Sequence, residues 1–269
     1  MRSAQAPTVS SSMFVDEART ATALRHPHIV STFESGVERN FMYIAMELVR
    51  GPSLYRLNRR LRSADRTYPV EAILRIGQTV ADALDYAQHV TVRGKALGLI
   101  HRDVSPHNIL LDMSGRPFLS DFGVARSSFQ EHETVRGEIR GKPGYMSPEQ
   151  VNEEAMDHRS DLFALGIVLW EMTTLRRLFK RDTLMKSLLA VAYDPAPDIR
   201  RFRPDAPDTL AELVASLLEK SPANRPSTAA QVRDWCQRLL PSGRAGQDLL
   251  AALIGRSFSE SEFDVDRWI

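Results

Sequence analysis

The 269-residue sequence lacks several features, and each absence excludes a class of protein. It contains a single cysteine, Cys236, so it cannot form an internal disulfide, and this favours a reducing compartment. Its longest apolar run, near 163–170, is far shorter than the roughly 18 residues that a membrane-spanning helix needs. Residues 1–12 contain no apolar stretch of the kind that signal peptides carry. We therefore expect a cytoplasmic protein and no membrane segment in this chain.

An excess of charge of one sign is also missing. Lysine and arginine number 35, aspartate and glutamate 34, and the formal net charge is +1. This balance argues against broad electrostatic binding of nucleic acid or of an anionic membrane. Hydrophobic residues make up 43% of the sequence, which at this length is typical of a globular protein with one large domain or two small lobes.

The remaining pattern predicts a small mixed part followed by a larger helical part. Residues 13–25 have the spacing of an amphipathic helix, and two strand-like runs follow, HIVSTFES and FMYIAMELV. Two further short strand runs, GLIH and NILLD, lie near the middle of the chain. The other predicted helices lie at about 68–90, 159–173, 181–192, 207–219, 227–239 and 245–254. Two unequal parts imply a cleft between them, where a ligand commonly binds.

Five short motifs occur in one order along the chain. They are HRDVSPHN (101–108), DFG (121–123), GKPGYMSPE (141–149), SDLFALG (160–166) and NRPS (224–227). Each motif alone is a weak signal, but the set in this order closely resembles the signature of the eukaryotic-type protein kinase family. The similarity is nearest to the bacterial serine/threonine branch of that family, and it covers roughly residues 13–240.

This resemblance implies an α+β, bilobal fold, with an N-lobe reduced to one helix and two or three strands and a mainly helical C-lobe. It implies transfer of the ATP γ-phosphate to a hydroxyl group of a protein substrate, with ATP and Mg²⁺ as cofactors. VSPHN favours serine and threonine over tyrosine as the acceptor. On this basis the chain divides into a linker without regular structure (1–12), a partial N-lobe with the hinge (13–50), a C-lobe (51–240) and a C-terminal helix with a tail (241–269).

The resemblance also assigns catalytic roles. Asp103 would orient the substrate hydroxyl and accept its proton, and Asn108 and Asp121 would hold Mg²⁺ through hard oxygen donors. Gly123 would permit the backbone turn that directs Asp121 toward the metal.

Other residues would bind the nucleotide from the hinge between the lobes. Met46 occupies the gatekeeper position of the family. The backbone of Glu47 and Val49 would face adenine, and Leu110 would pack beneath the ring.

A third set would hold the site in place. His101 and Phe122 belong to the packed spine between the lobes, and Asp161 would accept backbone hydrogen bonds from the catalytic loop. Glu149 and Arg225 would form an ion pair that ties the activation segment to the late helices.

Two departures from the family pattern lie close to Asp103. Serine/threonine kinases usually carry a lysine where this chain has Ser105, and a threonine where it has Lys142. We expect Lys142 to supply the positive charge that Ser105 cannot. The alternative is that Lys142 is solvated and the site is weakened.

The activation segment carries candidate regulatory residues. Arg102, beside Asp103, matches kinases in which an arginine pairs with a phosphorylated residue of that segment. Thr134 is our first choice of acceptor, ahead of Ser127 and Ser128. The alternative is an ordinary polar loop.

The start of the chain departs most from the family. By resemblance Glu17 lies on the helix that faces the nucleotide, where its partner should be a lysine on an earlier strand. No lysine precedes Lys95, and Gly36 is the only glycine before Gly51, so neither that strand nor a glycine-rich loop is present. We expect either a chain that begins inside a longer reading frame and is weakly active, or a catalytically silent interaction or scaffold module. The protein substrate and the oligomeric state cannot be predicted from the sequence.

Overall fold

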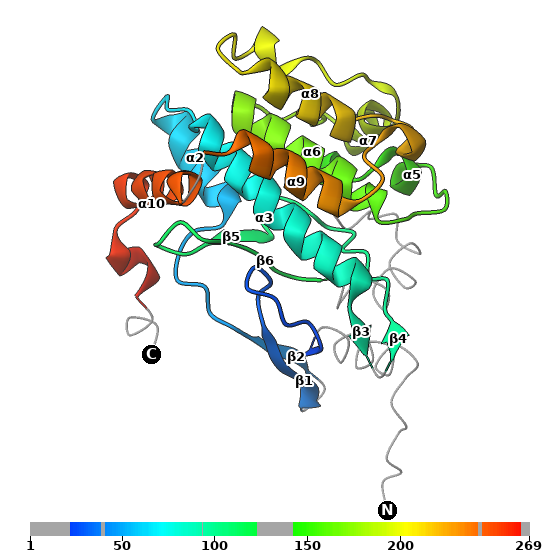
Figure 1. Cartoon of the computed structure of the whole chain (residues 1–269), viewed down its shortest axis with the longest axis vertical. Helices are drawn as coiled ribbons and strands as arrows, with labels where there is room; N and C mark the ends of the chain where they lie inside the picture. Colours follow the sequence, from blue (N-terminus) through cyan, green and yellow to red (C-terminus); the bar gives the residue numbers. More distant parts are fainter. Residues whose placement is uncertain (1–21, 39–40, 93, 123–141, 242–243, 265–269) are drawn as a thin grey trace, which may run out of the picture.

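The computed structural model describes residues 22–38, 41–92, 94–122, 142–241 and 244–264. Within these residues a small β-hairpin lies beside a much larger, mainly helical part (Figure 1). This arrangement confirms the expected α+β fold with a reduced N-lobe and a helical C-lobe. The helix expected at 13–25 falls almost entirely outside the described residues. None of the described helices combines the length and the hydropathy that crossing a bilayer requires.

The described part of the N-lobe is one antiparallel hairpin, β1 (Thr32–Glu38) and β2 (Phe41–Met46). No third strand in the described residues pairs with it. Its connection to the C-lobe includes a backbone hydrogen bond of 2.8 Å from Leu119 N to His28 O. A two-stranded sheet has little apolar cover, and the Phe41 side chain is 78% exposed.

The larger part is built from helices, six of which begin and end close to the predicted positions, whereas the helices at 54–63 and 148–151 were not predicted. In chain order the described α-helices are α2 (Leu54–Ser63), α3 (Val70–His89), α5 (Pro148–Val151), α6 (Arg159–Thr174), α7 (Leu184–Tyr193), α8 (Asp208–Leu217), α9 (Ala229–Leu239) and α10 (Ala245–Ser257). The hydroxyl groups of Ser53, Thr183 and Thr228 each accept a hydrogen bond from the backbone N–H three residues later. These caps satisfy N–H groups that lack a partner inside the helix, so the sequence itself sets the start of α2, α7 and α9.

One predicted strand is wrong. GLIH, at 98–101, forms no strand, because the backbone N–H of His101 donates to the buried Asp161 carboxylate at 2.7 Å instead of to a neighbouring strand. NILLD does contain a strand. The short strand pairs of the C-lobe are β3 (Thr91–Val92) with β4 (Lys95–Ala96), and β5 (Ile109–Leu111) with β6 (Pro117–Leu119).

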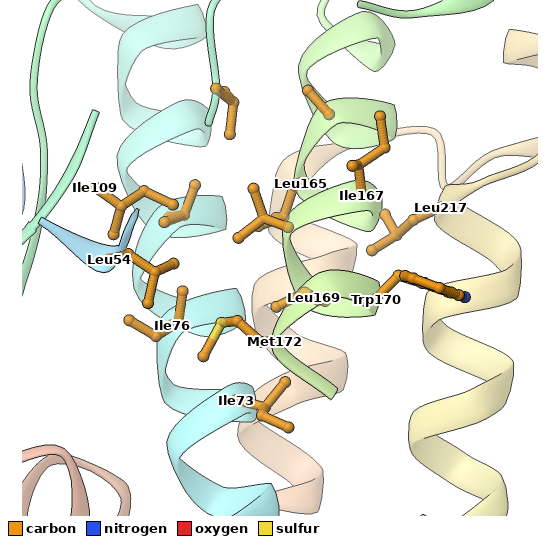
Figure 2. Close-up of a cluster of buried hydrophobic side chains, with 14 of the residues drawn as sticks. Leu54, Ile73, Ile76, Ile109, Leu165, Ile167, Leu169, Trp170, Met172 and Leu217 are labelled. Carbon is orange, nitrogen blue, oxygen red and sulfur yellow. The ribbon is translucent and has the colours of Figure 1, made fainter. Parts of the chain in front are cut away.

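Helix α6 forms the centre of the C-lobe. Fourteen of its 16 residues are buried, and α3 and α8 pack against it on different sides. Figure 2 shows Leu165 on the side of α6 that faces α3 and Trp170 on the side that faces α8. Cys236 is buried between α9 and α3, where a Cβ added to Gly77 would lie 3.0 Å from its sulfur, so this cysteine packs the core as predicted. The core therefore gives the catalytic loop a rigid base.

Candidate active site

The catalytic loop is held by a buried carboxylate at the start of α6. Asp161 accepts hydrogen bonds from the backbone N–H groups of His101 (2.7 Å) and Arg102 (2.8 Å). Burial raises the pKa of Asp161, and the two N–H groups partly offset that effect by stabilising its charged form. Arg102 adopts a positive φ of 66°. This unusual backbone conformation is thus held in place by hydrogen bonds at its own N–H and at that of its neighbour.

His101 and Phe122 lie together beneath this loop. His101 Nε2 lies 2.8 Å from Ser120 O, a carbonyl that can only accept, so Nε2 carries the proton. His101 Nδ1 then accepts from the Asp103 backbone N–H at 3.2 Å. The Phe122 ring meets the imidazole edge-on, with 4.6 Å between ring centroids. The imidazole therefore links the segment before Asp121 to the segment that carries Asp103.

Asn108 is fixed directly on Asp103. Its Nδ2 donates to the backbone oxygen and to Oδ2 of Asp103, both at 2.9 Å. The Asn108 amide orientation is thereby defined, and Oδ1 points away from Asp103. Asp121 lies nearby at a positive φ of 61°, and the Ser120 hydroxyl connects it to Asn108, 3.1 Å from Asp121 Oδ2 and 3.2 Å from Asn108 O.

Lys142 completes this group of polar side chains. Its ammonium donates to Ser105 Oγ at 2.8 Å and to Asn108 Oδ1 at 3.0 Å, and it lies 3.6 Å from Asp103 Oδ2. Ser105 is fully buried, and Lys142 is partly buried. The structure thus brings Lys142 from the activation segment into contact with the catalytic loop.

The backbone of Lys142 is anchored by residues that the sequence analysis missed. Lys142 O accepts from Tyr145 N at 2.8 Å, and the Tyr145 hydroxyl donates to Glu171 at 2.7 Å. Arg177 Nε donates to the same carboxylate at 3.1 Å. Burial raises the pKa of Glu171, while Arg177 and Tyr145 oppose that effect. A glutamate directly after the apolar run of α6 was the available signal, since such a residue is buried only with partners.

A second missed residue is His107. Its ring stacks on Tyr55 of α2, with 4.0 Å between centroids. Burial lowers the pKa of His107, and the nearby charges of Lys142 and Arg177 lower it further. The imidazole is therefore neutral near pH 7, which avoids a further positive charge beside Lys142.

Glu149 and Arg225 form a buried two-pronged ion pair. Arg225 Nη1 and Nη2 donate to the two Glu149 oxygens at 2.7 and 2.8 Å, and the Ser160 hydroxyl adds a third bond at 2.6 Å. Burial alone would raise the pKa of Glu149, but these hydrogen bonds hold it below its ordinary value. The pair connects α5 to the segment before α9. Loss of either residue would leave the other charge buried without its partner.

The hinge residues lie along the end of β2. Glu47 pairs with Ser31, through Glu47 N to Ser31 O at 2.8 Å and through Ser31 N to Glu47 Oε2 at 3.3 Å. Met46 is 40% exposed, whereas Val49 and Leu110 are half-buried. Leu110 lies on β5 and forms an isolated backbone bridge with Ser53.

Three residues named from the sequence, Glu17, Gly123 and Thr134, lie outside the described residues, as do Ser127 and Ser128.

The donor set fits Mg²⁺ rather than a metal held by protein alone. In the described part of the chain, no three His, Cys, Asp or Glu side chains are grouped so as to hold a metal. Asp121 offers one carboxylate, and Asn108 offers one carboxamide oxygen, Oδ1, which accepts from the Lys142 ammonium at 3.0 Å in this structure. Mg²⁺ is usually held by one or two carboxylates together with substrate phosphates and water, so the two residues would hold a nucleotide-bound Mg²⁺ once the ammonium moves off Asn108 Oδ1.

An aspartate bonded to an asparagine, a carboxylate after β6 and a buried Glu–Arg pair, all on a bilobal fold, are typical of the protein kinase fold. The family model described as "Protein kinase domain" matches residues 1–236. The chain therefore belongs to the eukaryotic-type protein kinase family, in its bacterial branch.

Its relatives are bacterial kinases. It is 34% identical over 255 residues to the tyrosine-protein kinase MasK of Myxococcus xanthus, a match that covers 93% of this chain and 39% of MasK. It is 32% identical over 216 residues to the serine/threonine-protein kinase PrkC of Bacillus subtilis, covering 80% of this chain and 32% of PrkC. Among solved structures, the PknI kinase domain of Mycobacterium tuberculosis matches with a TM-score of 0.63 and 26% identity, over 86% of this chain and 79% of that one. The chain thus spans well under half the length of these two curated relatives.

Proposed function

We propose that this protein transfers the γ-phosphate of ATP to a hydroxyl group of a protein substrate. The observation that carries the proposal is the contact of Lys142 with three residues of the catalytic loop, at 2.8–3.6 Å. Phosphate transfer requires positioning and neutralisation of charge more than covalent chemistry, and this group offers both. Asp103 receives the substrate hydroxyl and accepts its proton.

The chain's own residues prepare the site for the nucleotide. Asn108 and Asp121 hold Mg²⁺, which neutralises phosphate charge when it is bound. The hydrogen bonds from Asn108 Nδ2 orient Asp103, so its carboxylate is in place before the substrate arrives. The backbone of Glu47 and Val49 binds adenine, and Leu110 supports the ring from below.

We further propose that Lys142 replaces the lysine that the family carries in the catalytic loop. Its ammonium lies 2.8 Å from the hydroxyl of Ser105, the residue at the position of that lysine. The ammonium of Lys142 therefore lies next to the position at which the family carries its lysine, although it belongs to the activation segment and not to the catalytic loop. An ammonium beside Asp103 stabilises the negative charge of the phosphate during transfer.

Transfer of radiolabelled phosphate from Mg²⁺–ATP to a general protein substrate tests the function. We expect Asp103→Asn to lower the rate by about 10²–10⁴-fold, the range for a lost general base. The matched control is Asp182→Asn, because the Asp182 side chain is 94% exposed and its ion pair is with Lys186, outside the catalytic loop. Equal incorporation by the unmodified protein and by Asp103→Asn would rule out this mechanism.

We propose that the 269-residue chain alone binds Mg²⁺–ATP weakly, since the family pairs the glutamate at the position of Glu17 with an earlier lysine and no lysine precedes Lys95 in this sequence. Isothermal titration with Mg²⁺–ATP tests this, and tight binding contradicts it. The DNA upstream of Met1 separates the two explanations. An in-frame glycine-rich loop and lysine strand favour a longer, active kinase, whereas an immediate stop codon favours the silent scaffold.

The acceptor hydroxyl has two candidates. VSPHN in the catalytic loop and relatives named serine/threonine-protein kinase favour serine and threonine. The relation to MasK, which is named a tyrosine-protein kinase, favours tyrosine. We propose serine and threonine, and phosphoamino-acid analysis of a labelled substrate decides between them. Phosphosite mapping of the protein itself tests Thr134 as the residue that pairs with Arg102.

We also propose the domain division at residues 12, 50 and 240 and a cytoplasmic location. Limited proteolysis tests the division, with first cleavage expected in 1–12 and after 240. Cell fractionation tests the location.

A further inference from the structure

Helix α10 lies beyond residue 236, where the match to the kinase family ends. Together with the short helix Glu260–Phe263 it forms a segment that we call the C-terminal brace, residues 245–263. Figure 1 shows α10 beside α2, next to the turn that joins β5 to β6. The brace therefore touches the part of the C-lobe that carries the proposed metal pair.

Contact between α10 and the β5–β6 turn is very close. Gly115 in that turn has a φ of +76°, and a Cβ placed there would lie 2.2 Å from Gln247 O. The buried Gln247 side chain donates from Nε2 to Ser114 O at 3.1 Å and accepts from Arg75 Nη2 at 3.4 Å. One side chain thus joins the turn to helix α3.

The helix itself is held against α3. A Cβ added to Gly246 would lie 2.5 Å from Glu71 O, so the two backbones are almost in contact. Leu250 and Ile254 are fully buried in the main core. α10 is therefore a fixed support for the turn.

The second half of the brace contacts α2. Arg56 and Arg60 lie over the Phe258 ring, at 5.3 and 5.0 Å from its centroid, and both donate to Glu262, at 3.4 and 3.2 Å. Ser53, the cap of α2, forms a backbone bridge with Leu110 on β5. The brace thus contacts the β5–β6 hairpin directly at its turn, through Gln247, and indirectly at β5, through α2.

The hairpin transmits this support to the site because it is short. Asn108 comes directly before β5, and Asp121 follows two residues after β6. The Ser120 N–H donates to Asn108 O at 2.9 Å and closes the open end of the hairpin. With three residues in each strand, a displacement of the turn tilts the end that carries both residues.

We propose that Gln247 is a positioning residue that holds the β5–β6 turn and thereby sets the geometry of Asn108 and Asp121. The metal part of this inference rests on the proposed function. Substitution of residues that orient metal ligands typically weakens metal binding or activity by about 10–100-fold.

The test uses hydrogen exchange and Mn²⁺ binding on the whole 269-residue protein. Gln247→Leu removes both hydrogen bonds, and Gln247→Glu retains the acceptor for Arg75 but loses the donor to Ser114. Gly115→Ala disturbs the same contact from the turn. Ala252→Gln, on the exposed face of α10, is the matched control.

We expect all three test variants to speed exchange at the Leu111, Leu119 and Ser120 amides, whereas α6 exchanges as in the unmodified protein. Gln247→Leu should also weaken Mn²⁺ binding, measured by electron paramagnetic resonance with ATP present, by about 10–100-fold. Exchange that rises equally in α6, or that does not change, overturns the brace. Amide exchange in the β5–β6 hairpin tests the positioning role of Gln247, and phosphate transfer by the unmodified protein tests the proposed function. Failure of one claim can therefore be told from failure of the other.

Discussion

The β1–β2 hairpin and helix α6 differ in how far their apolar side chains are buried. In α6, Leu165 is fully buried, with helices packed on several sides. In the hairpin, Phe41 is 78% exposed and Phe33 is 64% exposed, and no third strand in the described residues pairs with β1 or β2. A single hairpin in water is at best marginally stable without such cover.

This difference explains where the site is rigid. The catalytic loop is fastened to α6 through Asp161, and Lys142 is fastened to α6 through Tyr145 and Glu171. In the proposed function, the adenine side depends on Glu47 and its neighbours, next to the β1–β2 hairpin. The proposed chemistry would then be preorganised by the C-lobe, whereas nucleotide affinity would depend on the N-lobe.

The largest expected effect concerns the buried ion pair of the C-lobe. Arg225→Met leaves the Glu149 carboxylate buried without its partner, so we expect the free energy of unfolding to fall by about 3–5 kcal/mol. Arg200→Gln is the matched control, because the ion pairs of Arg200 with Asp198 and Asp208 are exposed to solvent, which screens them, so we expect a much smaller loss. Urea denaturation measures both. Equal losses would contradict the view that the C-lobe pair holds the structure together.

A pair of leucines compares the two regions directly. Leu165→Ala in α6 should lower the free energy of unfolding by about 2–5 kcal/mol, through lost burial and the cavity left behind. Leu48, just after β2, is 62% exposed, and Leu48→Ala should change it by less than about 0.5 kcal/mol. If Leu48→Ala proves as destabilising as Leu165→Ala, the Leu48 side chain is buried by other parts of the protein.

The smallest effect is a dependence of stability on pH. Burial lowers the pKa of His26, His28 and His107 below 6.5. Between those lowered values and 6.5 the unfolded chain binds more protons than the folded one, so stability is complete above pH 6.5 and is lost as the pH falls. Urea midpoints at pH 8 and pH 6 should differ more for the unmodified protein than for His107→Asn. A His107→Asn variant with an unchanged pH dependence would remove His107 from this explanation.

The sequence could predict contacts that a motif encodes. The contacts of Asp161 with the catalytic loop and of Glu149 with Arg225 follow from the resemblance to the kinase family that the motifs carry, and six of the helices follow from apolar spacing. The positions of Gln247 and Glu171 could not be predicted in this way. Gln247 contacts the Ser114 backbone and Arg75, which lie far away in the chain. The sequence marks Glu171 as a buried residue that needs partners, but it does not show that these are Tyr145 and Arg177. The wrong strand at 98–101 has the same origin, because Asp161 takes the N–H groups that a strand needs.

The most direct test of the central claim moves the charge of Lys142 to the position of Ser105. Lys142→Thr should lower kcat by about 10²–10³-fold, because the ammonium beside Asp103 is lost. Adding Ser105→Lys to that variant should restore most of the rate, since the charge returns to the same place from the catalytic loop. Phosphate transfer is measured for both variants and for the unmodified protein under identical conditions. Full activity in Lys142→Thr alone would show that Lys142 does not supply the catalytic charge.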